Sequence, residues 1–344
     1  MAARTRPDGP PTEPDRLAAW ALSRIAAAAA EDAHVNAVID LDRPARATEP
    51  NLGGRFHAHP LGRTTSRHQV PRLRFHLEGI SSQRLRDEDS EEPWAALLDP
   101  ARLIRGIGAV NEARWRGPWL ELGLIPHPMF ASPTDPWLPP GAQSLTVQLD
   151  PATGFLHSAT LLDDLGPVAT ARVVELDLLQ VSDPNPAGTV LARMARTLLE
   201  PARLTALIHI DADPCDDLFL APLPSARSWT VSCDSARLTV TGDYEPDRTS
   251  PAAARLAELL APARIVSHLA RVTAASPNSV SATVRPFRTF PFSAWAPDET
   301  LTCRFTVDPT TGVLLHAEAT AEHRLLLRHT VTALGPEQPD QPAG

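Results

Sequence analysis

Apolar residues along this chain recur with two different periods, and the changes of period predict both helices and strands. Residues 17–30 are mostly apolar but are interrupted by Ser23 and Arg24, which predicts an amphipathic helix. Thr189 is expected to cap a second helix over 191–199. There the apolar residues recur at the i, i+3, i+4 and i+7 spacing of a helix face that packs on a core: Leu191, Met194, Ala195 and Leu198.

Strands are predicted where apolar and polar residues alternate. Each predicted helix is followed by such a run, at 35–41 and at 204–210. Further runs flank two Asp-Pro-x-Thr-Gly sequences, in which proline fixes φ, aspartate accepts hydrogen bonds and glycine adopts φ > 0. The chain therefore predicts two β-hairpins and two short helices, in these places: hairpins at 145–149 with 155–161 and at 303–307 with 313–319, and helices at 93–104 and 252–269.

The elements occur twice in the same order, which indicates an internal duplication. Four pairs of segments match at separations that shrink along the chain: 72–76 with 237–241 at 165 positions, 97–104 with 259–266 at 162, and, both at 158, Trp137 with Trp295 and 150–154 with 308–312. Differences in loop length between two copies would change the separations in this ordered way. We therefore interpret the chain as two copies of one module.

The duplication predicts an α+β fold of two tandem modules. Each is expected to be a curved antiparallel sheet, a half-barrel, with helices packed on its concave face. The expected boundaries are a disordered tail at 1–14, a first module at 15–182, a linker at 183–189, a second module at 190–334 and a disordered tail at 335–344. Because Trp137 and Trp295 are repeated, we expect them in the core or at the rim of a ligand cavity between helix and sheet.

Composition and charge narrow the class of protein. The formal charge of −9 argues against nucleic-acid binding, which needs a concentrated basic face. No run approaches 18 uninterrupted apolar residues, so neither a membrane span nor a signal peptide is expected. The three cysteines are far apart, which is typical of unpaired thiols in a reducing compartment. We therefore expect a cytoplasmic protein, and, without a GxGxxG or Walker loop, no cofactor.

The order of helix, long strands and mid-module helix resembles the LolA-like half-barrel superfamily, as do the hairpins around Asp150 to Gly154 and Asp308 to Gly312. That superfamily includes the lipoprotein carriers LolA and LolB, the sensor RseB and lipid-binding modules of the LppX type. The resemblance covers roughly 15–182 and 189–334. It implies a hydrophobic cavity that binds acyl chains or other apolar ligands without chemistry. This chain is expected to depart from those families, because neither a signal peptide nor a lipid-attachment cysteine is expected near its start.

Histidines and aspartates supply the candidate chemistry. His57, His59 and His68 have the residue types of a zinc site, but the Gly-, Arg- and Pro-rich sequence around them favours a surface loop, and no metal is expected. The carboxylates of 211–217 lack the glycine and the distal glutamate of a calcium loop, so they are interpreted as a solvated loop.

Two further histidines follow the repeated turns. His157 lies three residues after its turn glycine and His316 lies four, so the two are predicted to be non-equivalent and on opposite faces of their strands.

Three functions remain open. The first is a non-catalytic protein that carries or senses a hydrophobic small molecule or an acyl chain. The alternative is an intracellular interaction or regulatory module, in which two half-barrels grip a partner protein across their interface. The third is an enzyme of small-molecule metabolism that uses the cavity. Its candidate catalytic residues are His76, His209 and Asp211, which lie on or beside predicted strands; no GxSxG nucleophile elbow is present.

Overall fold

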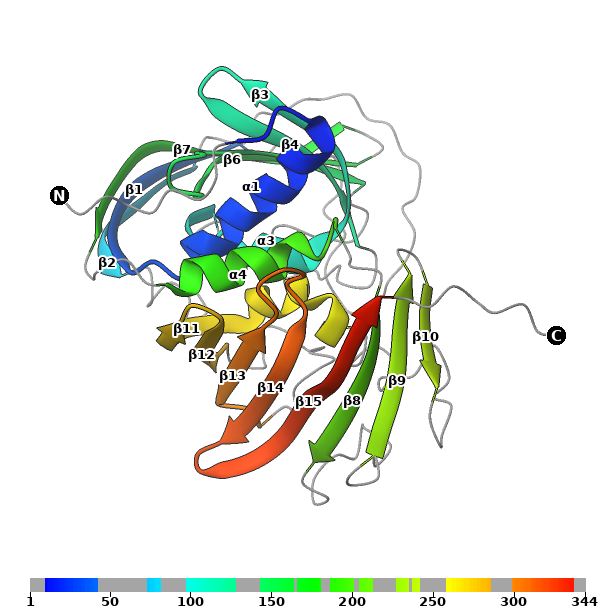
Figure 1. The fold of residues 1–344 in the computed structure, drawn as a ribbon. Coiled ribbons are helices and arrows are strands. Elements are labelled where there is room, and N and C mark those ends of the chain that lie inside the picture. The colour runs from blue at the N-terminus through cyan, green and yellow to red at the C-terminus, as the bar shows by residue number, and fades with distance from the viewer. Residues whose placement is uncertain are drawn as a thin grey trace, which may run out of the picture.

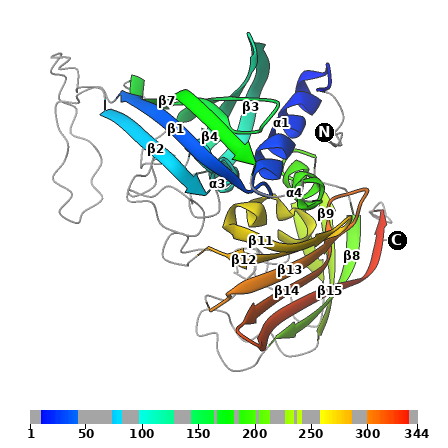
Figure 2. The same cartoon turned by 90° about the vertical axis from the view of Figure 1, so that its left-hand side faces the viewer.

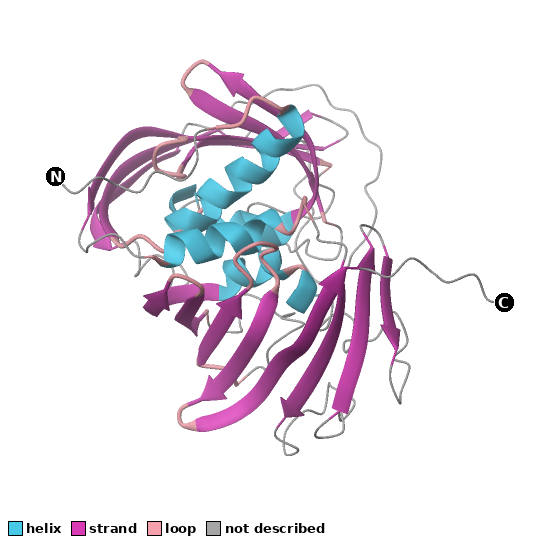
Figure 3. Cartoon of the chain, in the orientation of Figure 1, coloured by secondary structure: helices cyan, strands magenta, loops and turns pink. Residues whose placement is uncertain are grey.

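Two antiparallel sheets with helices between them make up the fold (Figure 1). The structure is a computed structural model, and it describes residues 10–42, 73–81, 97–127, 143–163, 166–180, 186–200, 204–212, 227–234, 237–241, 258–285 and 299–336. Figure 3 shows the helices gathered between the sheets, and each sheet curves around them. The predicted α+β architecture of two curved antiparallel sheets with helices on their concave faces is confirmed.

The first module has a seven-stranded sheet. In chain order its elements are α1 (Pro14–Ala28), β1 (Ala33–Asp42), β2 (Leu73–Ser81), α3 (Ala101–Gly106), β3 (Ile107–Arg116), β4 (Trp119–Pro126), β5 (Ser144–Leu149), β6 (Leu156–Asp163) and β7 (Gly166–Gln180). The first helix, the strand over 35–41 and the first hairpin are where the sequence places them.

The second module has an eight-stranded sheet. Its elements are α4 (Ala187–Arg196), β8 (Leu204–Ala212), β9 (Arg227–Asp234), β10 (Arg237–Thr241), the 3₁₀ helix η3 (Pro262–His268), β11 (Leu269–Ser276), β12 (Ser279–Val284), β13 (Thr302–Val307), β14 (Leu314–Ala321) and β15 (Arg324–Pro336). The strand over 204–210 and the second hairpin are confirmed. The cap prediction is wrong, because α4 begins at Ala187 and Thr189 already lies in its first turn.

Both sheets have the same topology. The strand order is β2-β1-β7-β6-β5-β4-β3 in the first and β10-β9-β8-β15-β14-β13-β12-β11 in the second. In each module the strand after the N-terminal helix therefore pairs with the last strand. The predicted match of 72–76 with 237–241 is wrong. Strand β2 lies next to β1, so it corresponds to β9, which lies next to β8. Residues 237–241 form β10, a strand that the first sheet lacks among the described residues.

The first helix is buried on almost every side, although the sequence predicts an amphipathic one. Residues 17–23 are all buried, because α1 packs on its own module on one side and on α4 on the other. A helix that is apolar all round belongs to an interior. In α4, Leu191, Met194 and Ala195 are buried as predicted, whereas Leu198 lies beyond the helix end and is half-buried.

The repeated turns fix each N-terminal helix to its sheet. Gly154 and Gly312 have φ of 79° and 78°, and a Cβ on them would lie 2.2 Å from the Arg24 carbonyl oxygen and 2.5 Å from that of Arg193. Both turns therefore require glycine for two reasons: the positive φ, and the lack of room for a Cβ atom. Arg24 and Arg193 are thus counterparts, 169 positions apart.

The hairpins β3–β4 and β11–β12 explain why the separation between matched positions of the two modules changes from 162 to 158 residues. Each strand of the first hairpin is two residues longer than its counterpart, with 10 and 8 residues against 8 and 6. The edge strands β3 and β11 carry bulges at equivalent positions, after Ile107 and Leu269 and again after Val110 and Val272. Bulges of this kind interrupt an edge that could otherwise pair with another chain.

Candidate functional site

The space between helices and sheets, where a cavity is predicted, is filled with side chains in the described part of each module. Large side chains such as Leu22, Ile25 and Phe155 in the first module, and Leu191 and Phe305 in the second, are at most 1% exposed. They belong to one continuous apolar cluster that runs through both modules. This region is core, and a ligand would need another surface.

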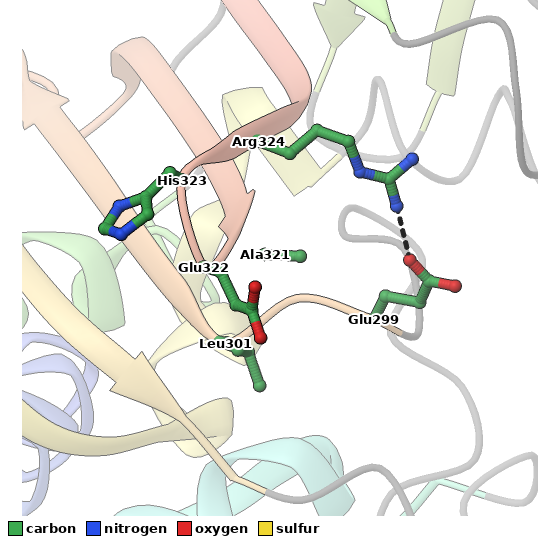
Figure 4. Close-up of a pocket in the computed structure, with 6 residues that line it drawn as sticks. All are labelled: Glu299, Leu301, Ala321, Glu322, His323 and Arg324. Carbon is green, nitrogen blue, oxygen red and sulfur yellow. Dashed lines mark hydrogen bonds and ion pairs between the residues drawn. The ribbon is translucent and has the colours of Figure 1, made fainter.

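One hollow of about 630 Å³ lies at the tip of the β14–β15 hairpin, away from the helices (Figure 4). It is lined by polar and charged side chains together with an exposed leucine: Glu299, Leu301, Ala321, Glu322, His323 and Arg324. The Arg324 guanidinium contacts the Glu299 carboxylate at 2.6 Å, and both side chains are largely exposed. An open, charged hollow of this kind does not suit an apolar ligand.

The last part of β7 exposes apolar side chains, and we call Val174, Leu176 and Leu178 the β7 apolar strip. Val174 is 41% exposed, Leu176 37% and Leu179 67%, while Leu178 is half-buried against the core. Exposed apolar side chains are ordinary when scattered but indicate a binding surface when they are contiguous. Leu176 and Leu178 alternate on one side of β7, whereas Leu179 pairs with the exposed His34 and lies on the other face.

The register of β7 shows which side of the sheet the strip faces. Leu176 pairs with Ala37 and Leu178 with Val35. Side chains of paired residues share a face of the sheet, and both β1 partners are fully buried in the core. Leu176 and Leu178 therefore continue the concave apolar face to where it becomes accessible. Figure 2 shows β1, β2 and β7 side by side in this part of the first sheet.

The strip belongs to the first module alone. The residues 158 positions later are Thr332 and Leu334, of which the threonine is exposed and the leucine half-buried. The duplication repeats the scaffold here but not the apolar surface. Sequence reasoning missed the strip because the alternation of Glu175, Leu176, Asp177 and Leu178 fits any strand with one buried face.

The candidate catalytic residues are separated by the fold. His76 lies on β2 of the first sheet, opposite Val38, and His209 lies on β8 of the second, between Ser228 and Thr330. His209 is half-buried. Asp211 lies two residues further along β8 and pairs with Arg328. His209 and Asp211 thus lie on the same strand of the second sheet, whereas His76 lies in the first sheet.

The remaining candidate residues lie outside the described residues: Trp137, Trp295, His57, His59 and His68. Where the structure describes the chain, no group of three or more His, Cys, Asp or Glu side chains is placed to hold a metal ion. In the same ranges no helix is long and apolar enough to cross a membrane.

A polar row on the outer face of the second sheet accompanies His209. His316 pairs with Thr330, which in turn pairs with His209. The His316 Nδ1 atom is 3.3 Å from the Thr330 hydroxyl, and its Nε2 atom is 3.2 Å from the Glu318 carboxylate. Burial raises the pKa of Glu318, but the hydrogen bond from Arg328 and the nearby His316 outweigh it and lower the pKa below its ordinary value. The row was missed because His209 lies on β8, far in sequence from the β14–β15 hairpin that carries the other members.

The two histidines that follow the repeated turns are not equivalent, as predicted. His316 pairs with Thr306, and the pair 158 positions earlier is Ser158 with Gln148, so the counterpart of His316 is Ser158. His157 instead stacks on Trp119, with ring centroids 4.1 Å apart and planes 8° from parallel. Its pKa is lowered, first by burial and then by the positive charge of Arg172.

Comparisons with known proteins identify no family for this chain. No protein-family model matches the chain, and no curated protein sequence matches it. Among solved structures, the complex of Pseudomonas aeruginosa MucA and MucB is similar with a TM-score of 0.23 and 12% identity, over 94% of this chain and 99% of that chain. A structure of MucB in complex with MucA(peri) gives 0.22 and 11% over the same shares. TM-scores this low carry no conclusion about function.

Proposed function

We propose that this chain is a non-catalytic binding protein that holds an apolar ligand, an acyl chain or a similar hydrophobic molecule, against the β7 apolar strip. The observation that carries the proposal is the exposure of Val174 and Leu176 next to the half-buried Leu178 on one strand. Leu176 and Leu178 join this surface to the concave face, so a ligand there would lie against the edge of the core.

The strip suits a flexible, elongated apolar ligand better than a compact one. A strand rises about 3.3 Å per residue, so residues 174–178 extend over roughly 13–17 Å. A chain lying along them would gain about 0.8 kcal/mol for each CH₂ group taken out of water. Burial of five such groups would supply about 4 kcal/mol, before the loss of ligand freedom is subtracted.

Native mass spectrometry of gently purified protein and uptake of an apolar fluorescent dye test the proposal. We expect a bound apolar species or saturable dye binding, and a Leu176→Asp variant should lose it, because a carboxylate in the strip would have to be desolvated. Leu301→Asp is the matched control, since Leu301 is an exposed leucine just before β13 of the second module, outside the strip. A clean mass without dye uptake, or equal loss in both variants, would contradict the proposal.

A protein partner is the second candidate, and it requires a different surface from the one predicted. Gripping a partner across the interface of the modules is disfavoured, because that interface is filled by α1, α3, α4 and η3 packed on one another. The projecting β3–β4 hairpin is the better surface. It is longer than its counterpart and carries Trp115, which is 42% exposed, between Arg114 and Arg116.

Trp115→Ala separates the second candidate from the first. A partner recovered from the native host at near-physiological salt should be lost with Trp115→Ala and kept with Leu176→Asp. The reverse pattern would favour the apolar strip. The enzyme alternative stays a prediction. Its support would be removed if His209→Ala left every measured turnover unchanged.

A further inference from the structure

The two modules meet through counterpart elements. Helix α1 packs on α4, and α3 packs on η3, which occupies the same place in the second module. At the first of these contacts the Ser23 hydroxyl donates to the Ala192 carbonyl at 3.2 Å. Ser23 and Ala192 are 169 positions apart, the separation of Arg24 from Arg193, so Ser23 contacts its own counterpart. A contact of this kind occurs on the axis of a two-fold arrangement.

The contact between α3 and η3 has a specific set of hydrogen bonds. Arg264 of the second module donates from Nη2 to the Ile107 carbonyl at 2.9 Å and from Nη1 to the Arg105 carbonyl. Two backbone hydrogen bonds confirm the equivalence of the surroundings. The amide of His127 donates to Gly106 at 2.8 Å, and the amide of Arg285 donates to His268 at 2.9 Å. His127 and Arg285 are therefore counterparts.

A buried ion pair breaks this two-fold equivalence. The Arg285 guanidinium donates through Nη2 to the Asp99 carboxylate of the first module, and through Nε to the Ser267 carbonyl at 3.0 Å. The side chains of Arg285 and Asp99 are 4% and 2% exposed. The counterpart of Asp99 is Ala261 and that of Arg285 is His127, so the mirror position lacks both members of the pair.

The asymmetry decides which modules can associate. In a first module paired with another first module, Asp99 would face His127. In a second module paired with another second module, Arg285 would face Ala261 and remain buried without a carboxylate. A buried charge without its partner is strongly unfavourable, whereas the paired arrangement is tolerated. Only unlike modules satisfy both charges.

We infer that the chain is a covalently fused dimer, whose interface is approximately two-fold and whose buried Asp99–Arg285 pair joins unlike modules into one cooperative unit. The partner that this module surface fits is the other module of the same chain. The inference does not depend on what the protein binds. It requires that loss of the ion pair uncouples the two modules before either one unfolds.

Urea unfolding of the full chain, followed by hydrogen exchange and mass spectrometry, tests the coupling. In the native protein, amides of β5–β6 and of β13–β14 should lose protection together. Arg285→Met leaves Asp99 buried without its partner, and should lower the folding equilibrium constant by on the order of 10²–10³-fold and separate the two losses. Arg324→Met is the control, because it removes an exposed ion pair of the second module and should change little. Joint loss of protection in Arg285→Met would overturn the inference.

Exchange of the charges tests whether the pair acts directly. The double variant Asp99→Arg with Arg285→Asp should recover part of the stability that each single change loses. Strictly additive losses would contradict the assignment.

Placing a second ion pair at the symmetry-related position tests the two-fold axis itself. If Ala261 and His127 face each other as the axis requires, Ala261→Asp and His127→Arg together should destabilise less than the sum of the two single changes. Non-additivity of this kind is expected only for residues in contact. Additive destabilisation would show that the two positions do not meet, and the fused-dimer inference would fail.

Discussion

Replacing Gly154 with alanine tests the joint between helix and sheet, because this glycine is constrained in two separate ways. Its φ of 79° lies in the left-handed region, and a Cβ would lie 2.2 Å from the Arg24 carbonyl oxygen and 2.9 Å from the carbonyl carbon. The obstacle is helix backbone, which cannot rotate away as a side-chain end would. The Arg24 side chain is also engaged there, with Nε donating to the Pro151 carbonyl at 3.0 Å.

The two constraints have separate magnitudes. Holding a residue other than glycine in the left-handed region costs about 1 kcal/mol. Forcing an additional carbon into a packed contact costs about 1–3 kcal/mol, because backbone and side chains must shift. We therefore expect Gly154→Ala to lower the free energy of unfolding by about 2–4 kcal/mol, and Gly312→Ala to do the same. That is a large share of the roughly 5–15 kcal/mol that stabilises a typical domain.

Gly117→Ala is the matched control, and urea denaturation is the assay. Gly117 has a φ of 61°, but nothing lies within 4 Å of where its Cβ would be. Gly117→Ala should therefore lower the free energy of unfolding only by the cost of the left-handed conformation, about 1 kcal/mol. The difference between the two variants isolates the contact with α1. Equal shifts of the urea midpoint for Gly154→Ala and Gly117→Ala would refute the close packing of turn on helix.

Three further predictions concern titratable groups. Burial raises the pKa of the Cys303 thiol, so, in a Cys215→Ser, Cys233→Ser background, a thiol reagent should modify it only after denaturation. Burial and two nearby arginines lower the pKa of His268 from 6.5 to about 3. The stability that the neutral histidine contributes is therefore kept above about pH 6.5 and is lost as the pH falls towards 3. His268→Asn should flatten that part of a curve of stability against pH. Burial raises the pKa of Glu121, but hydrogen bonds outweigh it and lower the pKa below 4.5, so the stability advantage over Glu121→Gln should hold above that pH and shrink as acid protonates the carboxylate.

Repeated local patterns made much of the fold predictable from the sequence. The segments around Gly154 and Gly312 fixed two hairpins, because turn residues and alternation act over a few neighbouring positions. The match of 97–104 with 259–266 likewise identified α3 and η3 as counterparts. The match of 72–76 with 237–241 failed, because alternating residues specify a strand without specifying its neighbour in the sheet.

The burial of α1 could not be predicted, because it depends on a partner that lies far away in the sequence. Ser23 and Arg24 look like the start of a polar face. In the structure the Ser23 hydroxyl is satisfied by the Ala19 and Ala192 carbonyls, and Arg24 reaches the turn at Pro151. The space where a cavity is predicted, between helix and sheet, is filled by core side chains such as Leu22, Ile25 and Phe155. A pattern confined to one copy carries no information about how two copies pack.

Differences between the copies, rather than their shared positions, point to where function and assembly were added. The shared positions are turns, bulges and core residues, which any two such modules need. The positions that differ include Asp99 against Ala261, which allows only unlike modules to pair, and the exposed Val174 of the strip against Thr332. If the apolar strip binds the ligand, it does so in one module alone, and the second module serves as the body against which the first is held. Binding of one apolar ligand for each chain, rather than two, is the stoichiometry that this arrangement requires.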